Sequence, residues 1–201
     1  MTWEDVRRAT LQKMFSLDGT VINANDEGIK DYLNAMPQAA NEALQLLCTA
    51  GKYLVREYPL PEEKAKGQRL TIDLKKDLPD FYQMGLLLQL ASDGTPEPVL
   101  GVQLVAGRYL VIPPSAEGTL LLSYNAWPQE ITLATPASEE LELDREVVVL
   151  LPLYMASQLY KEDDSALATA YRNEFEAAFA LLQNAPITIE SNEFTSVTGW
   201  I

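Results

Sequence analysis

Two clusters of acidic residues are the first candidates for chemistry in this sequence. One comprises Glu139, Glu140, Glu142 and Asp144, and the other is the Glu-Asp-Asp run at 162–164. Carboxylate oxygens are the ligands that calcium prefers. Neither cluster follows the EF-hand pattern, with its central glycine and terminal glutamate. We therefore predict that both clusters serve helix capping and surface charge, and that the chain binds no metal.

The chain has no histidine and a single cysteine, Cys48. Catalytic triads built on histidine, the usual zinc sites and an intrachain disulfide are therefore excluded. The phosphate-binding patterns GxxxxGK[ST] and GxGxxG are also absent from the sequence. Cys48 lies in an Ala/Leu-rich segment, which predicts a small buried side chain and not a nucleophile. We expect no catalytic residue and no cofactor, so the chain is predicted not to be an enzyme.

The 201 residues carry 15 basic and 29 acidic side chains, a net charge of −14. The excess is uneven: residues 136–201 hold 3 basic and 12 acidic side chains (net −9), against 8 and 10 in 1–68 (net −2) and 4 and 7 in 69–135 (net −3). Duplex DNA binding needs a clustered basic face, so this balance argues against it. It predicts a solvated surface, or one that repels a polyanion or meets a basic partner.

The sequence shows no targeting or membrane signal. Residues 1–5 lack the basic and apolar regions of a secretory signal. The longest apolar run, 147–155, is far shorter than the roughly 20 residues of a membrane span and contains Pro152. We therefore expect a soluble protein.

The first third of the chain is predicted to be helical. Thr2, with Asp5 three positions later, resembles a capping box at a helix start. A second helix is expected from about residue 26. Pro37 should break or restart it, because proline suits the first turn of a helix and not its interior. Gly51 is the expected C-cap.

The middle third changes to strand-like patterns. Residues 56–68 are charged and contain prolines, which predicts a linker. The Ala106-Gly107 pair between two apolar runs predicts a hairpin turn. Short strands with no helix between them predict a small antiparallel sandwich or barrel, inserted between helical segments. The expected strands cover 70–74, 85–90, 100–105, 109–112, 119–124 and a short run at 130–133.

The last third returns to helix. Residues 146–161 are apolar nearly all round, which predicts a buried helix that Pro152 either kinks or begins. Asp164 or Ser165 should cap a final helix that ends near Gln183. The two helices should pack as an antiparallel αα-hairpin. The predicted packing stripe of the final helix is Leu167, Tyr171, Phe175 and Phe179, with Leu182.

Aromatic residues mark two candidate binding surfaces. Tyr124 and Trp127 lie at the expected exit of a strand, where they could stack on a sugar or a peptide. Aromatic residues at this place also fasten a sandwich to its neighbour. A second set is favoured as the core of the αα-hairpin over a ligand groove, because of its helical spacing: Tyr154, Tyr160, Tyr171, Phe175 and Phe179.

The predicted fold is α+β: a helical bundle closed by a C-terminal αα-hairpin, with an inserted β sandwich or barrel lobe. The expected segments are the N-terminal helices (1–57), the β lobe (58–135), the hairpin (136–183) and a tail (184–201). The tail is rich in apolar residues, which disordered segments seldom are. It either packs on its own chain or docks on a neighbouring subunit, for example by strand addition.

This order of elements resembles the head–tail connector (adaptor) proteins of tailed bacteriophages, which form a ring beneath the portal. Three local sequence motifs contribute to the resemblance. They are the apolar helix, acidic turn and Ala-rich helix at 151–160, 162–164 and 166–175; the run 120–124 with Trp127-Pro128; and Asn41-Glu42-Ala43-Leu44.

The resemblance implies a non-enzymatic virion structural protein of a phage or prophage. Its partners would be further copies of itself in a ring, the portal protein and tail proteins. DNA would pass only as cargo, sliding along an acidic wall without sequence-specific binding. The protein would move from the host cytoplasm to the head–tail junction of the virion. The interface residues expected are Arg172 and Glu176 on the last helix, and Phe194, Trp200 and Ile201 in the tail.

Two alternatives stay open. One is another structural component of a prophage tail or baseplate. The other is a ligand-binding module whose β lobe takes a glycan or peptide at Tyr124 and Trp127.

Overall fold

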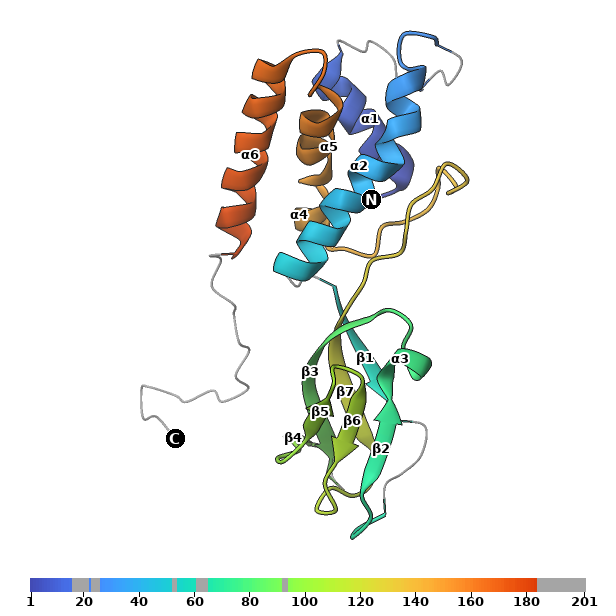
Figure 1. Ribbon diagram of the computed structural model, residues 1–201, viewed down its shortest axis with the longest axis vertical. Coiled ribbons are helices and arrows are strands. Elements are labelled where there is room, and N and C mark those ends of the chain that lie inside the picture. Colours follow the sequence, from blue (N-terminus) through green and yellow to red (C-terminus); the bar gives the residue numbers. More distant parts are fainter. Residues whose placement is uncertain (16–21, 23–25, 52–53, 61–64, 92–93, 184–201) are drawn as a thin grey trace, which may run out of the picture.

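The computed structural model has two lobes stacked along its long axis, a helical body and a β lobe (Figure 1). Strands β1 (Val55–Pro59) and β7 (Leu120–Ala126) lie side by side where the chain enters and leaves the β lobe. Apart from one four-residue helix in the β lobe, helices and antiparallel sheets occupy separate regions, so the predicted α+β class is confirmed. The structure describes residues 1–15, 22, 26–51, 54–60, 65–91 and 94–183.

The helical body is built around α5 (Leu151–Leu159), which packs against α1 (Trp3–Met14), α2 (Lys30–Ala50) and α6 (Ser165–Gln183). Most of the α5 side chains are buried, as their apolar character predicts. Helix α6 runs along one side of the body with α5 as its main neighbour, which confirms the αα-hairpin (Figure 1).

Polar side chains cap two of these helices. Thr2 Oγ1 accepts a hydrogen bond from the Asp5 amide at 3.2 Å, and the Thr2 amide donates to Asp5 Oδ2 at 3.1 Å, which confirms the capping box. Asp164 Oδ1 accepts from the amides of Ala166 and Leu167, both at 3.0 Å, so Asp164 caps α6. Part of the acidic run 162–164 therefore serves helix capping.

One expectation about prolines is wrong and another is confirmed. Helix α2 begins at Lys30 and continues through Pro37 without a break. Pro37 is buried together with Met36, Ala39 and Ala40, and this packing offsets the hydrogen bond that proline removes. Pro152 lies in the first turn of α5, one of the two positions expected for it. The segment 146–161 forms two helices, α4 (Arg145–Val148) and α5, in place of the single helix expected.

The β lobe contains two small antiparallel sheets of four and three strands, ordered β1-β7-β3-β4 and β2-β6-β5. In the described ranges they form a sandwich and no closed barrel. Alternate residues of β7 point inward and are buried. The short helix α3 (Leu74–Asp77) follows β2. The remaining strands are β2 (Leu70–Asp73), β3 (Phe81–Leu90), β4 (Pro96–Pro98), β5 (Gln103–Val105) and β6 (Tyr109–Ile112).

Two strand predictions are wrong. Strand β1 covers the start of the expected linker 56–68, and it pairs with β7 although its sequence is polar. An edge strand can be polar because only part of it is buried. Residues 130–133 form no strand, because Ile131 is held by a side chain of α2 instead. The division into one helical bundle, made of 1–57 and 136–183, and an inserted lobe at 58–135 stays a prediction.

The predicted hairpin at Ala106-Gly107 is confirmed, since it joins β5 to β6. The Arg108 amide donates to the carbonyl of Val105 at 3.1 Å and closes the turn. Both central residues have positive φ, 52° for Ala106 and 61° for Gly107. This left-handed backbone matches the twist of a two-stranded ribbon and favours glycine.

Candidate interaction sites

The predicted interface pair on α6 forms an ion pair within its own helix. Arg172 Nε lies 2.7 Å from Glu176 Oε1, one helical turn away. The guanidinium also lies 5.0 Å from the ring centroid of Tyr154 and 5.7 Å from that of Phe175. The hydrogen bond to Glu176 raises the pKa of Arg172. Arg172 is therefore fixed over the aromatic core. A contact between these residues and another subunit stays a prediction.

The hairpin aromatics form the core between α5 and α6, as predicted. Tyr154 meets Phe175 edge to face at 5.2 Å, and Tyr160 stacks on Tyr171 at 6.2 Å. Phe179 continues the stack from Phe175 at 5.7 Å. The tyrosine hydroxyls at the far end reach α1, where Tyr171 donates to the carbonyl of Lys13 at 2.6 Å. These aromatics hold α6 to the body.

The prediction that Leu167 belongs to the packing stripe of α6 is wrong. It is 42% exposed, and Ala168 takes the buried position beside α5. The stripe starts one residue later than predicted, because Ala168, Tyr171 and Phe175 follow the three- and four-residue spacing of a helix face. Leu181, at the other end of α6, is 75% exposed.

Tyr124 is a core residue of the β lobe and presents no free ring face to a ligand. It is 4% exposed, and its ring packs on Phe81 at 5.9 Å. Its hydroxyl donates to the Asp80 carboxylate, with O···O distances of 3.2 and 3.3 Å. Burial, followed by the charge of Asp80, raises the pKa of Tyr124. The expectation of a stacking platform at Tyr124 is therefore wrong.

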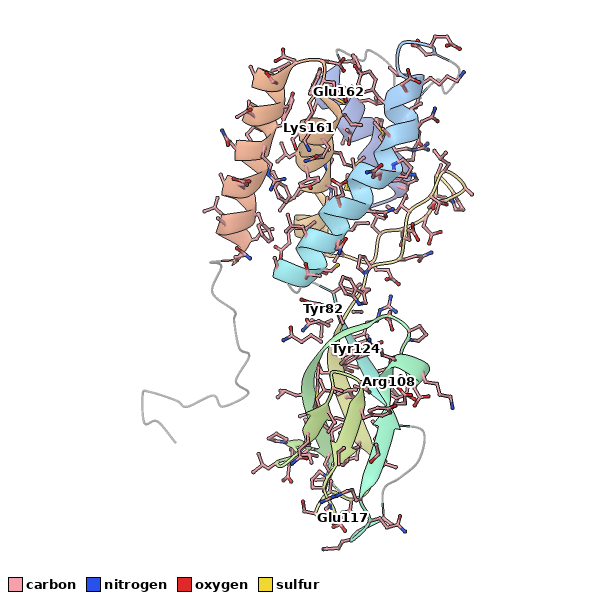
Figure 2. All side chains as sticks on the ribbon, viewed as in Figure 1. Tyr82, Arg108, Glu117, Tyr124, Lys161 and Glu162 are labelled. Carbon is pink, nitrogen blue, oxygen red and sulfur yellow. The ribbon has the colours of Figure 1, made fainter. Side chains whose placement is uncertain are left out.

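Trp127 differs from Tyr124, because it is 37% exposed. Its ring meets Tyr82 edge to face at 4.7 Å, and its amide donates to the carbonyl of Asp80 at 2.7 Å. Figure 2 shows Tyr82 at the end of the β lobe that faces the helical body. An open groove of about 350 Å³ lies beside Trp127. The groove is lined by Asn41, Gln45, Trp127, Pro128, Gln129 and Glu130.

Charged side chains link the two lobes close to this groove. Arg56 Nη1 lies 2.7 Å from Asp80 Oδ2, and Arg56 Nη2 pairs with Glu142. On the helical side, Asn41 holds the backbone of Ile131 through two hydrogen bonds of 2.8 Å. The sequence reasoning missed Arg56 and Asp80. No local pattern marks them, since each is one charge in a polar stretch.

The other candidate residues are placed as follows. Phe194, Trp200 and Ile201 lie outside the described residues. Glu139 and Glu140 belong to a segment that pairs with the N-terminus, where the Trp3 amide donates to the carbonyl of Glu139 at 2.8 Å.

Cys48 is buried, as predicted. Burial, followed by the charge of Glu142, raises its pKa to about 12. Across the described part of the chain, no three His, Cys, Asp or Glu side chains gather as a metal site would require. A search of the same residues finds no helix with the length and apolar character of a membrane span.

Comparison with known proteins gives a distant structural likeness. The chain matches no protein-family model and no curated protein. Among solved structures it is similar to a chain of "Neck of empty GTA particle computed with C6 symmetry". The two are 15% identical with a TM-score of 0.26, over 83% of this chain and 87% of that chain. The chain thus has a remote similarity to a component of a particle neck.

Proposed function

We propose that this chain is a non-enzymatic structural subunit of a phage or prophage virion, a head–tail connector that forms a ring below the portal. The architecture carries the proposal. N-terminal helices, an inserted antiparallel β lobe and a closing αα-hairpin follow one another in the order on which the resemblance to connectors rests.

The surface of α6 supports a role in assembly. This helix has 19 residues, of which only Ala168 and Phe175 are buried. Its outer side exposes Leu167 and Leu181. A long helix that uses one face internally leaves the other available to a neighbouring copy in a ring.

The charge of the chain fits a channel component. Net charges of −14 overall and of −9 in residues 136–201 (3 basic against 12 acidic) oppose tight binding of DNA. DNA would then pass as cargo, and the partners would be copies of the chain, the portal and tail proteins. The subunit would be made in the host cytoplasm and end at the head–tail junction.

Assembly is the direct test of this function. The DNA flanking the reading frame is sequenced first, and the portal protein found there is purified. The chain is then examined alone and with that portal by native mass spectrometry and electron microscopy. Rings that form on the portal support the proposal. Flanking metabolic genes, or a chain that stays monomeric with the portal, contradict it.

Two changes test which parts of the chain assemble. Truncation after Asn184 should leave a folded monomer but weaken ring formation. Leu181→Lys should weaken it as well, because a buried lysine is costly in a contact between subunits. Leu100→Lys is the matched control, since Leu100 is 81% exposed on the β lobe. If the truncated chain unfolds, the tail is part of the core of its own chain, and the assembly role proposed for the tail is wrong.

A further inference from the structure

We propose that the groove beside Trp127 is a docking site for a basic segment of a partner protein, in which an Arg or Lys side chain lies against the indole. This inference goes beyond the connector function and does not depend on ring formation. The groove lies where the β lobe meets the helical body, between α2 and the segment that follows β7.

Two hollows flank the same short segment, 128–130. The open groove of about 350 Å³ has the indole of Trp127 and the amides of α2 in its lining. The second hollow, of about 30 Å³, is apolar inside and is lined by Leu44, Leu54 and Leu143 among others. A cationic side chain in the groove with an apolar neighbour over the narrow hollow would use both.

The walls of the groove are held in place before any partner binds. Asn41 fixes the backbone of Ile131 on one side. On the other side, the Trp127 amide bonds to Asp80, and Tyr82 supports the indole. A preformed site loses little conformational entropy when it binds.

The charge around the groove selects a cation. All charged residues that line the two hollows are glutamates: Glu130 lines both, and Glu139, Glu140 and Glu142 line the narrow one. Glu142 pairs with Arg56, whereas no ion pair among the described residues involves the other three. These carboxylates repel an anion, and the face of an indole attracts a guanidinium or ammonium group.

The partner is a different protein and not a second copy of this chain. This chain has 15 basic against 29 acidic side chains, so it is poor in basic segments. Many of the chain's own cations are already used in internal ion pairs. Those in the described part are Arg7, Arg8, Lys30, Arg56, Lys66, Arg108 and Arg172. These charges favour a segment from a chain richer in Arg and Lys.

A peptide titration of the full chain tests this site. The probe is the acetylated, amidated peptide Gly-Leu-Arg-Arg-Leu-Gly, and the control peptide has Glu in place of both Arg. Binding is followed by two-dimensional NMR at low and physiological salt. We expect the Arg peptide to shift the indole N–H signal of Trp127 and the amides of 129–131, and to bind more weakly as salt rises.

Variants locate the binding to the groove. Trp127→Ala should weaken binding about tenfold, and Trp127→Phe, which keeps an aromatic face and the fold, should weaken it less. Glu130→Gln should also weaken it. Glu97→Gln is the matched control, because Glu97 is an exposed carboxylate on β4, and it should leave binding unchanged.

Several results would overturn the inference. They are equal binding of the Glu peptide, no binding of the Arg peptide, and binding that survives both Trp127 variants and Glu130→Gln. A neutral trisaccharide such as chitotriose that binds at Trp127 while the Arg peptide does not would make the groove a glycan site. If sedimentation shows that copies of the chain associate and that Glu130→Gln abolishes this association, the occupant of the groove is a second copy.

Discussion

Arg56 on β1 forms an ion pair with Glu142, 86 positions further along the chain, and this pair connects the β lobe to the helical body. The second terminal nitrogen of Arg56, Nη1, donates to the carboxylate of Asp80, the residue before β3. Glu142 follows the segment that pairs with the N-terminus of α1, where the Leu141 amide donates to the carbonyl of Met1 at 3.2 Å. One side chain thus helps to set how the two lobes are oriented.

Replacement of this arginine should loosen the joint between the lobes. Arg56→Met keeps the aliphatic stem but removes both ion pairs. The side chains involved are 36%, 24% and 44% exposed, so solvent screens them and the loss of unfolding free energy should be about 1 kcal/mol. Urea denaturation measures the loss, and small-angle X-ray scattering should show a broader range of lobe orientations.

Lys66→Met is the control for that change, because Lys66 and Glu117 form a longer, exposed pair at 3.6 Å. Its unfolding midpoint should not move. If Arg56→Met also leaves both the midpoint and the scattering curve unchanged, the pair does not orient the lobes.

The stability of the hairpin should depend on one aromatic side chain. Phe175 is fully buried and contacts the rings of Tyr154 and Phe179. Phe175→Ala should lower the unfolding free energy by about 3–4 kcal/mol, since it removes contacts and leaves a cavity. Leu181→Ala, on the exposed side of the same helix, should change it by no more than about 0.5 kcal/mol. Equal losses in the two variants would show that α6 does not pack through Phe175.

Alkaline pH should destabilise the fold through Cys48. Burial raises the pKa of its thiol to about 12 from an ordinary value of 9.0, so the folded chain holds the proton more tightly than the unfolded chain. The stabilisation is complete below about pH 9 and is lost as the pH rises toward about 12, by about 1.4 kcal/mol per unit between those values.

Cys48→Ala should remove this part of the pH dependence, which urea unfolding from about pH 8 to about pH 11 measures. A hydrogen bond to Asp163 raises the pKa of Tyr32 to about 12, so some loss above about pH 10 should remain. A variant whose stability falls as steeply as that of the parent chain would show that the thiol does not titrate in this way.

The turn between β5 and β6 offers a stabilising change. Ala106 has a φ of 52°, where a Cβ costs about 1 kcal/mol, so Ala106→Gly should raise the unfolding free energy by up to that amount. Gly107→Ala should lower it by a similar amount, because Gly107 has a φ of 61°. Thermal unfolding of both variants checks the pair, and opposite shifts in Tm are expected. Shifts of the same sign would contradict the left-handed backbone conformation of the two residues.

Local signals predicted the parts of the fold that depend on neighbouring residues in the chain. The Thr2–Asp5 capping box, the Asp164 cap and the Ala106-Gly107 turn each depend on residues within three positions of one another. The αα-hairpin was predictable because its aromatics repeat with the helical period. The start of its stripe was misplaced by one residue, because Leu167 and Ala168 both suit a helix and only packing on α5 distinguishes them.

Features that depend on distant parts of the chain could not be predicted. Strand β1 is polar in sequence and is a strand because β7 pairs with it. Pro37 stays inside α2 because tertiary packing outweighs its intrinsic preference. The contact of Arg56 with Asp80 and Glu142 joins three segments that no spacing rule relates. Burial of Tyr124 likewise depends on its packing against Phe81, which lies on another strand of the β lobe.

The pairing of β1 with β7 has a consequence for the history of the chain. The Ala126 amide donates to the carbonyl of Leu54 at 2.9 Å, so the chain leaves the β lobe beside the point at which it enters. A segment whose two ends touch can be gained or lost in one genetic event without separating the elements on either side. The helices could therefore exchange this lobe for another, or for a short loop, while their own packing is kept.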